Sequence, residues 1–146
     1  MDLISKDLIY LDEDVKDKDE LFKLIAKNLK RLGRIDNVEN FISDLYEREQ
    51  TAPTSMGEGI AIPHALSSEV LGTSLTYIKL KNEIKWNDQD LVKYIFNIAV
   101  PKENKNNVHL KIISSLARNL INDDFKEKIF ETKDINECYE VLNSIC

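Results

Sequence analysis

Residues 75–100 read LTYIKLKNEIKWNDQDLVKYIFNIAV, in which two apolar stretches enclose a polar one. The outer stretches, 75–80 and 92–100, are rich in β-branched and aromatic residues, which are typical of strands. The polar stretch 81–90 is predicted to be the turn between them, and Pro101 ends the second strand. We therefore expect a β-sheet at the centre of the fold.

Helices are predicted on both sides of this central segment, because apolar residues recur there at helical spacing. The first begins at a capping box formed by Asp17 and Glu20 and ends at Gly33. The second begins at the matching pair Asp36 and Glu39. Towards the C-terminus, three more stretches have helical periodicity: 108–121, 123–130 and 134–145.

The composition is that of one globular domain, with 146 residues of which 42% are hydrophobic and 32% are charged. We expect a single α/β domain over residues 1–146, with helices flanking a central sheet on both faces. A net charge of −6 without basic runs argues against a nucleic-acid partner. A charged N-terminus and the lack of a membrane-length apolar run predict a cytoplasmic protein. Cys138 and Cys146 have no CxxC spacing and are interpreted as reduced thiols.

The stretch GEGIAIPHAL, residues 57–66, carries the candidate chemistry. We predict a short buried strand at 59–63, with His64 at its C-terminal edge. Pro63 fixes its own φ and biases Ile62 towards extended conformations, so the backbone ahead of the histidine has little freedom. A neutral imidazole held in this way is a competent nucleophile toward a phosphoryl group.

Groups that can hold a phosphate are predicted nearby. Gly57 and Gly59 allow a loop whose N–H groups accept an anion, and Arg48, near the end of the second predicted helix, can neutralise phosphate oxygens. His109 falls in the first turn of the helix predicted over 108–121. Each feature also has an ordinary explanation, namely a structural Pro-His turn, a surface histidine, or an arginine that compensates a helix dipole.

Signatures of other common chemistries are absent from the sequence. It contains no GxxxxGK[ST] loop, no GxGxxG after a strand, no GxSxG elbow and no HExxH. Two histidines and two distant cysteines make a poor zinc set, so no metal is expected. A general-acid carboxylate pair stays open, because none of the spacings among 26 acidic residues selects one.

Three segments together resemble the fructose/mannitol-type EIIA domain of the phosphoenolpyruvate-dependent sugar phosphotransferase system: REQTAPTSMGEGIAIPHAL, VKYIFNIAVP and HLKIISSLARNL. The likeness runs almost from end to end and implies a mixed sheet between helices. An Arg-Glu pair, a Thr/Ser-Gly-x-Gly stretch, Ala-Ile-Pro-His and His-Leu recur in that family. Here they fall on Arg48-Glu49, Thr54 to Gly59, Ala61 to His64 and His109-Leu110.

The resemblance implies that His64 is phosphorylated by the phosphocarrier HPr, and that a cysteine of an EIIB partner then accepts the group. It also implies that His109 and Arg48 assist at the site, the first by a hydrogen bond and the second by its charge. Four loop residues are expected to hold phosphate oxygens: Thr54, Ser55, Gly57 and Gly59. No metal or organic cofactor is needed, because the phosphoryl donor is already activated. The partners are expected to dock on an apolar patch made by Met56, Ile60 and Leu66.

Two alternatives stay open beside the transport carrier. In one, His64 is phosphorylated but the phosphate biases contacts of a regulator, as in the sensor domain of a transcription regulator or a nitrogen-type EIIA. In the other, a degenerate domain binds partners without phosphorylation, because Glu58 puts a negative charge near the phosphate site where the family often has asparagine.

Overall fold

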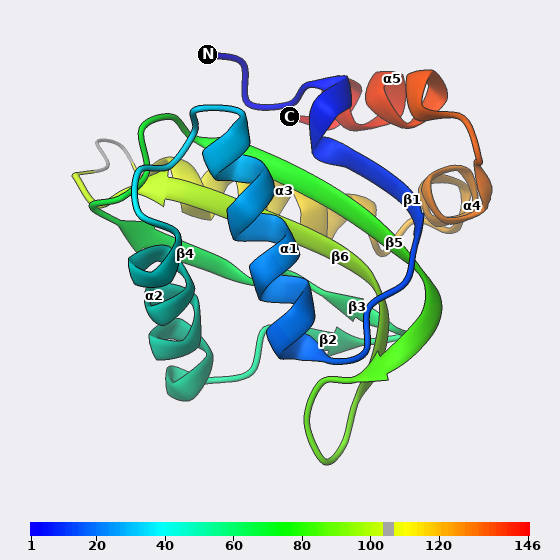
Figure 1. The fold of residues 1–146 in the computed structure, drawn as a ribbon. Coiled ribbons are helices and arrows are strands. Elements are labelled where there is room, and N and C mark those ends of the chain that lie inside the picture. Colours follow the sequence, from blue (N-terminus) through cyan, green and yellow to red (C-terminus); the bar gives the residue numbers. More distant parts are fainter. Residues whose placement is uncertain (104–106) are drawn as a thin grey trace.

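A mixed β-sheet runs through the protein in the computed structural model, which describes residues 1–103 and 107–146 (Figure 1). Its strands are β1 (Ile9–Glu13), β2 (Ser55–Gly57), β3 (Ile60–Ala61), β4 (His64–Ser67), β5 (Ser74–Lys85) and β6 (Leu91–Pro101). Their order is β1-β5-β6-β3-β2, and β4 also pairs with β6. The β5–β6 and β2–β3 pairs are antiparallel, whereas β1 lies parallel to β5, and β3 and β4 lie parallel to β6.

Helices cover both faces of this sheet (Figure 1). They are α1 (Lys18–Arg31), α2 (Val38–Thr51), α3 (Val108–Asn119), α4 (Asp123–Glu131) and α5 (Ile135–Ile145). Buried residues of α1 and α2 pack in one core with one sheet face, and those of α3, α4 and α5 pack in a second core on the opposite face. The predicted α/β class is therefore confirmed. In the described part of the chain, every helix is too short or too polar to cross a lipid bilayer.

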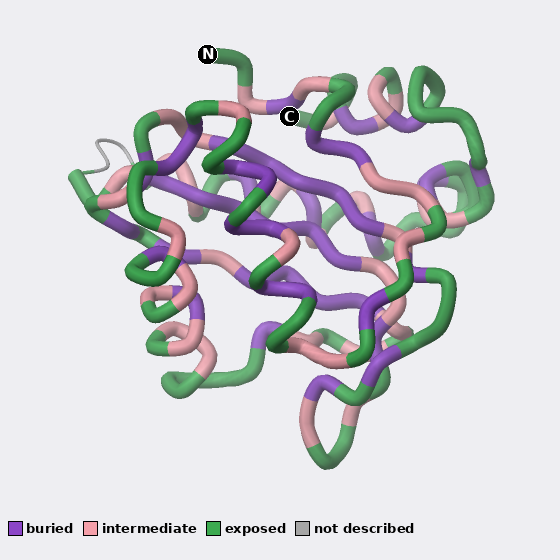
Figure 2. Tube along the Cα trace, in the orientation of Figure 1, coloured by how far each residue is buried: buried purple, intermediate pink, exposed green. Residues whose placement is uncertain are grey.

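The two longest strands, β5 and β6, lie between these cores, and their central stretches 74–80 and 95–100 are largely buried (Figure 2). Tyr77 and Phe96 stack on the α3–α5 side with ring centroids 4.9 Å apart, whereas Ile78 and Ile95 belong to the α1–α2 core. Because helices cover both faces of these stretches, they read as nearly continuous apolar runs instead of alternating patterns. The strands predicted at 75–80 and 92–100 are confirmed.

The first half of the polar stretch between them, residues 81–85, is strand, which corrects the predicted turn. β5 continues to Lys85, and its register with β6 shifts between Lys79 and Ile84, as at a β-bulge. The exposed polar residues of this segment made it look like a turn in sequence. The true turn begins at Trp86, whose backbone N–H donates to the carbonyl of Asp90 at 2.9 Å and whose indole is buried.

The N-terminal ends of the first two helices test the predicted caps. The Asp17 side chain accepts a hydrogen bond from the Glu20 N–H at 2.9 Å, which confirms the first. The second prediction is wrong by one residue, because Asn37 caps α2 by accepting from the Asn40 N–H at 2.8 Å. Asp36 instead donates its N–H to a neighbouring loop. No sequence pattern predicted β1, since charged residues surround it.

Candidate functional site

His64 is the first residue of β4, at a break in the sheet. β3 and β4 run one after the other beside β6, and Pro63 interrupts the ladder between them because it has no N–H to donate. Its carbonyl accepts from the Ile98 N–H at 3.0 Å, and pairing resumes at His64. The strand predicted over 59–63 is thus limited to β3, and the histidine opens a new strand instead of closing that one.

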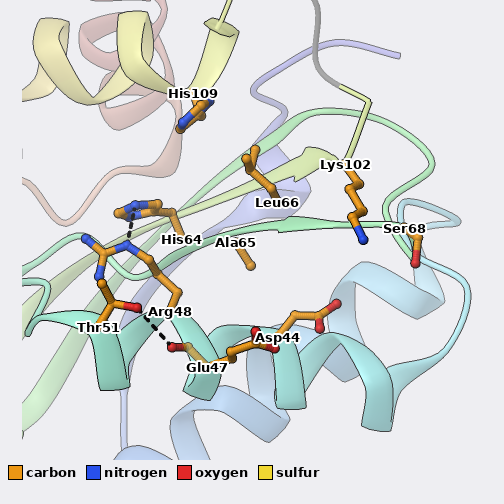
Figure 3. A pocket seen from close by; sticks show the side chains of 10 residues that line it. All are labelled: Asp44, Glu47, Arg48, Thr51, His64, Ala65, Leu66, Ser68, Lys102 and His109. Atoms are coloured by element: carbon orange, nitrogen blue, oxygen red, sulfur yellow. Dashed lines mark hydrogen bonds between the residues drawn. The ribbon is translucent and has the colours of Figure 1, made fainter.

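This position lets both helical layers reach the imidazole. Among the described residues, β4 pairs with β6 alone, so its other side is an edge of the sheet. Arg48 approaches from the last turn of α2, and His109 approaches from the first turn of α3, which lies on the opposite face. Figure 3 shows the His64 ring between these two side chains. The structure therefore brings together the three residues that the sequence selected separately.

The hydrogen bonds of His64 define its tautomer. Nδ1 lies 2.8 Å from the carbonyl oxygen of Ile62, which can only accept, so Nδ1 carries the proton. Nε2 lies 3.1 Å from Nε of Arg48, which can only donate, so Nε2 presents its lone pair. The ring is consequently neutral and nucleophilic at Nε2, with its orientation fixed from both ends.

Electrostatics favour the same neutral form. Burial lowers the pKa of His64 below its ordinary value, and the charges of Arg48 and His109 lower this pKa further. The hydrogen bond to the Ile62 carbonyl opposes these effects, but the net direction is downward. An unprotonated nitrogen is therefore available at neutral pH, as nucleophilic attack requires.

A surface cavity of about 370 Å³ opens over this ring. Arg48 is anchored at its rim, because Nη1 donates to the carbonyl of Ala52 at 2.8 Å while Nε reaches the imidazole. The other cavity-lining residues are Asp44, Glu47, Thr51, Ala65, Leu66, Ser68, Lys102 and His109 (Figure 3). A tetrahedral anion entering this cavity would meet a nucleophilic nitrogen and cationic or polar donors from two helices.

The four predicted loop residues lie elsewhere. None of them lines this cavity. Gly57 and Gly59 have positive φ values of 85° and 78° in the tight turn between β2 and β3. The carbonyl of Gly59 accepts from the N–H of Tyr94 on β6, whereas His64 lies beside Ile98, four residues further along the same strand. At the rise of a strand, the two positions on β6 are roughly 13 Å apart. The glycines shape a turn, and the geometry gives them no contact with a phosphate on His64.

Thr54 and Ser55 are likewise committed to other partners. Thr54 is buried, and both its N–H and its hydroxyl donate to the carboxylate of Glu49. The Ser55 hydroxyl donates to Asp90 at 2.6 Å. Thr54 nevertheless supports the site, since its carbonyl accepts from the N–H of Ile62 at 3.0 Å. The carbonyl of Ile62 in turn holds Nδ1 of the catalytic candidate.

Glu49 is a residue whose role the sequence did not reveal. Besides Thr54, it accepts a hydrogen bond from the indole Nε1 of Trp86 at 3.3 Å. It thereby connects α2, the β5–β6 turn and the segment that leads to His64. Its position beside Arg48 in the sequence was visible, but only the fold brings Thr54 and Trp86 to it. Lys102 was also missed, because it lies in a polar loop without a motif.

Glu58 does not face the cavity, which answers the concern about its charge. It sits at the tip of the glycine turn with a φ of 56° and forms an ion pair with Lys126 of α4 at 3.4 Å.

Of the predicted apolar patch, Leu66 is 42% exposed and lines the cavity, and Met56 is 45% exposed on β2. Ile60 is buried in the core and cannot be part of such a patch, which corrects that prediction.

Comparisons with known proteins identify the family and the fold of this chain. A family model described as "Phosphoenolpyruvate-dependent sugar phosphotransferase system, EIIA 2" matches residues 2–145. The mannitol-specific phosphotransferase enzyme IIA component of Bacillus subtilis (strain 168) is 31% identical, over 99% of each chain. Other relatives are longer proteins, of which this chain spans 22% or 17% of the length.

Two solved structures show the same fold. The nitrogen regulatory protein IIA-Ntr from Neisseria meningitidis has a TM-score of 0.86 and 26% identity, over 96% of each chain. A complex of enzyme IIAMTL and phosphorylated enzyme IIBMTL from Escherichia coli contains a chain with a TM-score of 0.79 and 23% identity, over 97% of each. Because a family model matches almost every residue and a full-length relative is 31% identical, this chain belongs to the EIIA 2 family of phosphoryl carriers in the phosphoenolpyruvate-dependent sugar phosphotransferase system.

Proposed function

We propose that Nε2 of His64 accepts a phosphoryl group from HPr and passes it to a cysteine of an EIIB partner during sugar uptake. The observation that carries this proposal is the orientation of the ring. Nδ1–H is held by the Ile62 carbonyl, and the Nε2 lone pair lies beside Arg48 at an open cavity. Family membership supports the phosphoryl chemistry, and the geometry supports this particular nitrogen as its acceptor.

The transfer balances without any further reagent. The Nε2 lone pair of His64 forms a bond to phosphorus while the phosphorus–nitrogen bond of the donor phosphohistidine breaks, and that bonding pair leaves with the donor imidazole. Nδ1 keeps its proton and its bond to the Ile62 carbonyl throughout. In the second step a partner thiolate attacks the same phosphorus, and the bonding pair returns to Nε2. Such transfers depend chiefly on alignment and charge stabilisation.

Arg48 and His109 supply that stabilisation in the proposal. Arg48 donates to Nε2 before transfer, and phosphorylation converts this atom from an acceptor into a phosphorus-bound nitrogen. The guanidinium is then free to turn its donors to phosphoryl oxygens, while Nη1 stays anchored on Ala52. His109 lies across the ring from Arg48 (Figure 3), and in the proposal it donates a hydrogen bond to the phosphoryl group.

The acceptor cysteine is assigned to another protein. Cys138 of this chain is fully buried, and burial raises its pKa to about 11, so its thiolate is scarce at neutral pH. A related IIA chain has been solved in complex with phosphorylated enzyme IIB, which supports an EIIB protein or domain as the acceptor. HPr is the proposed donor, and the proposed location is the cytoplasm, with membrane contact only through EIIB and EIIC partners.

A regulatory role is the second candidate, and the likeness to the nitrogen regulatory protein IIA-Ntr favours it. In that case His64 is still phosphorylated, but the group biases contacts with a regulated protein instead of moving to EIIB. The third hypothesis, a domain that binds without phosphorylation, loses its support because Glu58 pairs with Lys126 away from the cavity.

The deciding experiment measures the intact mass of the protein after incubation with phosphoenolpyruvate, enzyme I and HPr, with several EIIB proteins added afterwards. We expect one acid-labile phosphoryl group on the wild type and none on His64→Ala. Loss of that group to an EIIB protein identifies a transport carrier. Retention in the presence of every EIIB tried identifies the regulator, and an unmodified wild type would contradict both.

A further inference from the structure

Asn97 is a fully buried polar residue in the middle of β6. Its neighbours along the strand, from Ile95 to Ala99, are otherwise apolar and contribute to the two cores. Asparagine is disfavoured in strand interiors, and burying its carboxamide costs free energy unless both ends are hydrogen-bonded. The position therefore calls for an explanation other than packing.

The amide of Asn97 reaches the backbone directly ahead of the candidate nucleophile. Nδ2 donates to the carbonyl oxygen of Pro63 at 3.1 Å, and the Ile98 N–H donates to the same oxygen at 3.0 Å. Two donors on one carbonyl fix the plane of the peptide that joins Pro63 to His64. This peptide sets the direction in which the histidine side chain leaves the backbone.

The oxygen of the same carboxamide contributes no hydrogen bond among the described residues. Within the described residues, Oδ1 of Asn97 has no hydrogen-bond partner, although the residue is 0% exposed. A buried unpaired acceptor costs free energy that is comparable to or larger than the gain from one amide–carbonyl bond. An apolar side chain would suit the stability of β6 at least as well, so the use of Asn97 lies in the carbonyl that it holds.

We propose that Asn97 is a positioning residue for phosphoryl transfer, which acts on His64 through the Pro63 carbonyl and touches no reacting atom. The bond from the Ile62 N–H to Thr54 fixes the preceding peptide from the opposite side. Together these contacts keep the ring where Nδ1 meets Ile62 and Nε2 meets Arg48. Displacing a reacting group by about 1 Å can cost about 100-fold in rate, so even a small shift of the backbone at Pro63 and His64 should be measurable.

The test compares Asn97→Val with Thr76→Val. Thr76 faces Asn97 in the β5–β6 register, is 1% exposed and, like Asn97, has a side-chain oxygen without a hydrogen-bond partner among the described residues. Both substitutions remove a buried polar group from the same place in the sheet. Only the first removes a donor from Pro63. Asn97→Ser is measured as well, because it removes the amide while keeping a small polar side chain.

Two readouts are recorded on each folded variant. The first is the single-turnover rate of phosphorylation by phospho-HPr, which rests on the proposed function. The second is the tautomer of His64 from the ¹⁵N chemical shifts of its ring, which does not. We expect the Asn97 variants to be slower by about tenfold, with a mixed tautomer population and no loss of stability beyond that of Thr76→Val.

Unchanged rates and an unchanged tautomer in the Asn97 variants would overturn the inference. Equal slowing in Thr76→Val would overturn it too, because the effect would then belong to the core in general. If the wild type is not phosphorylated at all, the proposed function fails, and the ring tautomer alone decides the role of Asn97.

Discussion

Replacing Arg48 by glutamine tests the electrostatic part of the site. Arg48 is half-buried, and it donates hydrogen bonds to Nε2 of His64 at 3.1 Å and to the Ala52 carbonyl at 2.8 Å. Glutamine is shorter and uncharged, so it cannot donate to the ring and reach the carbonyl together. Because the positive charge of Arg48 lowers the pKa of His64, that pKa should rise in Arg48→Gln.

The size of the rate effect follows from the lost contact to the phosphoryl group. A hydrogen bond from a charged donor contributes about 1.5–3 kcal/mol. If that contribution is made at the transition state, where 1.36 kcal/mol corresponds to tenfold, phosphorylation should slow by about 10- to 150-fold. Stability should change little, since both contacts of Arg48 lie at the surface rim of the cavity.

The assay is rapid-quench transfer from radiolabelled phospho-HPr under single-turnover conditions. Arg118→Gln is the matched control, because Arg118 is exposed on α3 and its described hydrogen bond goes to Ser114 on the same helix. The control should react like the wild type. An Arg48→Gln protein that is phosphorylated at the wild-type rate would refute the assignment of Arg48 as the charge-stabilising group.

Three further predictions concern neighbouring groups. Burial lowers the pKa of His64, so below pH 6.5 the unfolded chain binds more protons than the folded one. The contribution of this histidine to stability is therefore full above pH 6.5 and is lost as the pH falls towards the folded pKa. In urea titrations the wild type should lose more stability than His64→Gln on acidification, and parallel losses would contradict this. His109→Ala should slow transfer while leaving His64 phosphorylatable by mass, and an unaltered rate would remove His109 from the mechanism. Glu49→Gln should lower the free energy of unfolding by about 1–2 kcal/mol, because the hydrogen bonds from Thr54 and Trp86 lose their charged acceptor. An unchanged midpoint of urea unfolding would argue against a stabilising role of Glu49.

Much of the fold was predictable because its elements have strong local signals. The buried stretches of β5 and β6 are covered on both faces and therefore read as apolar, β-branched runs. The start of α1 is indicated by the Asp17 cap. β1 has no such signal, since its pairing with β5 is a long-range contact between segments separated by two helices. The cap of α2 was placed one residue early because Asp36 and Asn37 are both good caps, and tertiary bonds to Asp36 decide between them.

The candidate site was predictable only in part, for a similar reason. The backbone restriction at Pro63 is local, so the presentation of His64 followed from sequence. The glycine turn was predicted to lie beside the phosphate site because Gly57 and Gly59 are close to His64 in sequence. In the structure, β3 carries the chain along β6 and away from that turn. The bond of Glu49 to Trp86 and the bond of Asn97 to Pro63 join segments more than 30 residues apart, which no spacing rule foresees.

The position of β4 also bears on solubility. A histidine that is proposed to react with partner proteins has to lie near the surface, and the outer edge of a strand there exposes N–H and C=O groups that can recruit a strand from another copy of the protein. This chain limits that risk by length: β4 has 4 residues and starts after a proline, whereas the 12 and 11 residues of β5 and β6 are enclosed within the sheet. The strand that presents His64, the proposed phosphoryl acceptor, is therefore a poor template for edge-to-edge aggregation because of its shortness.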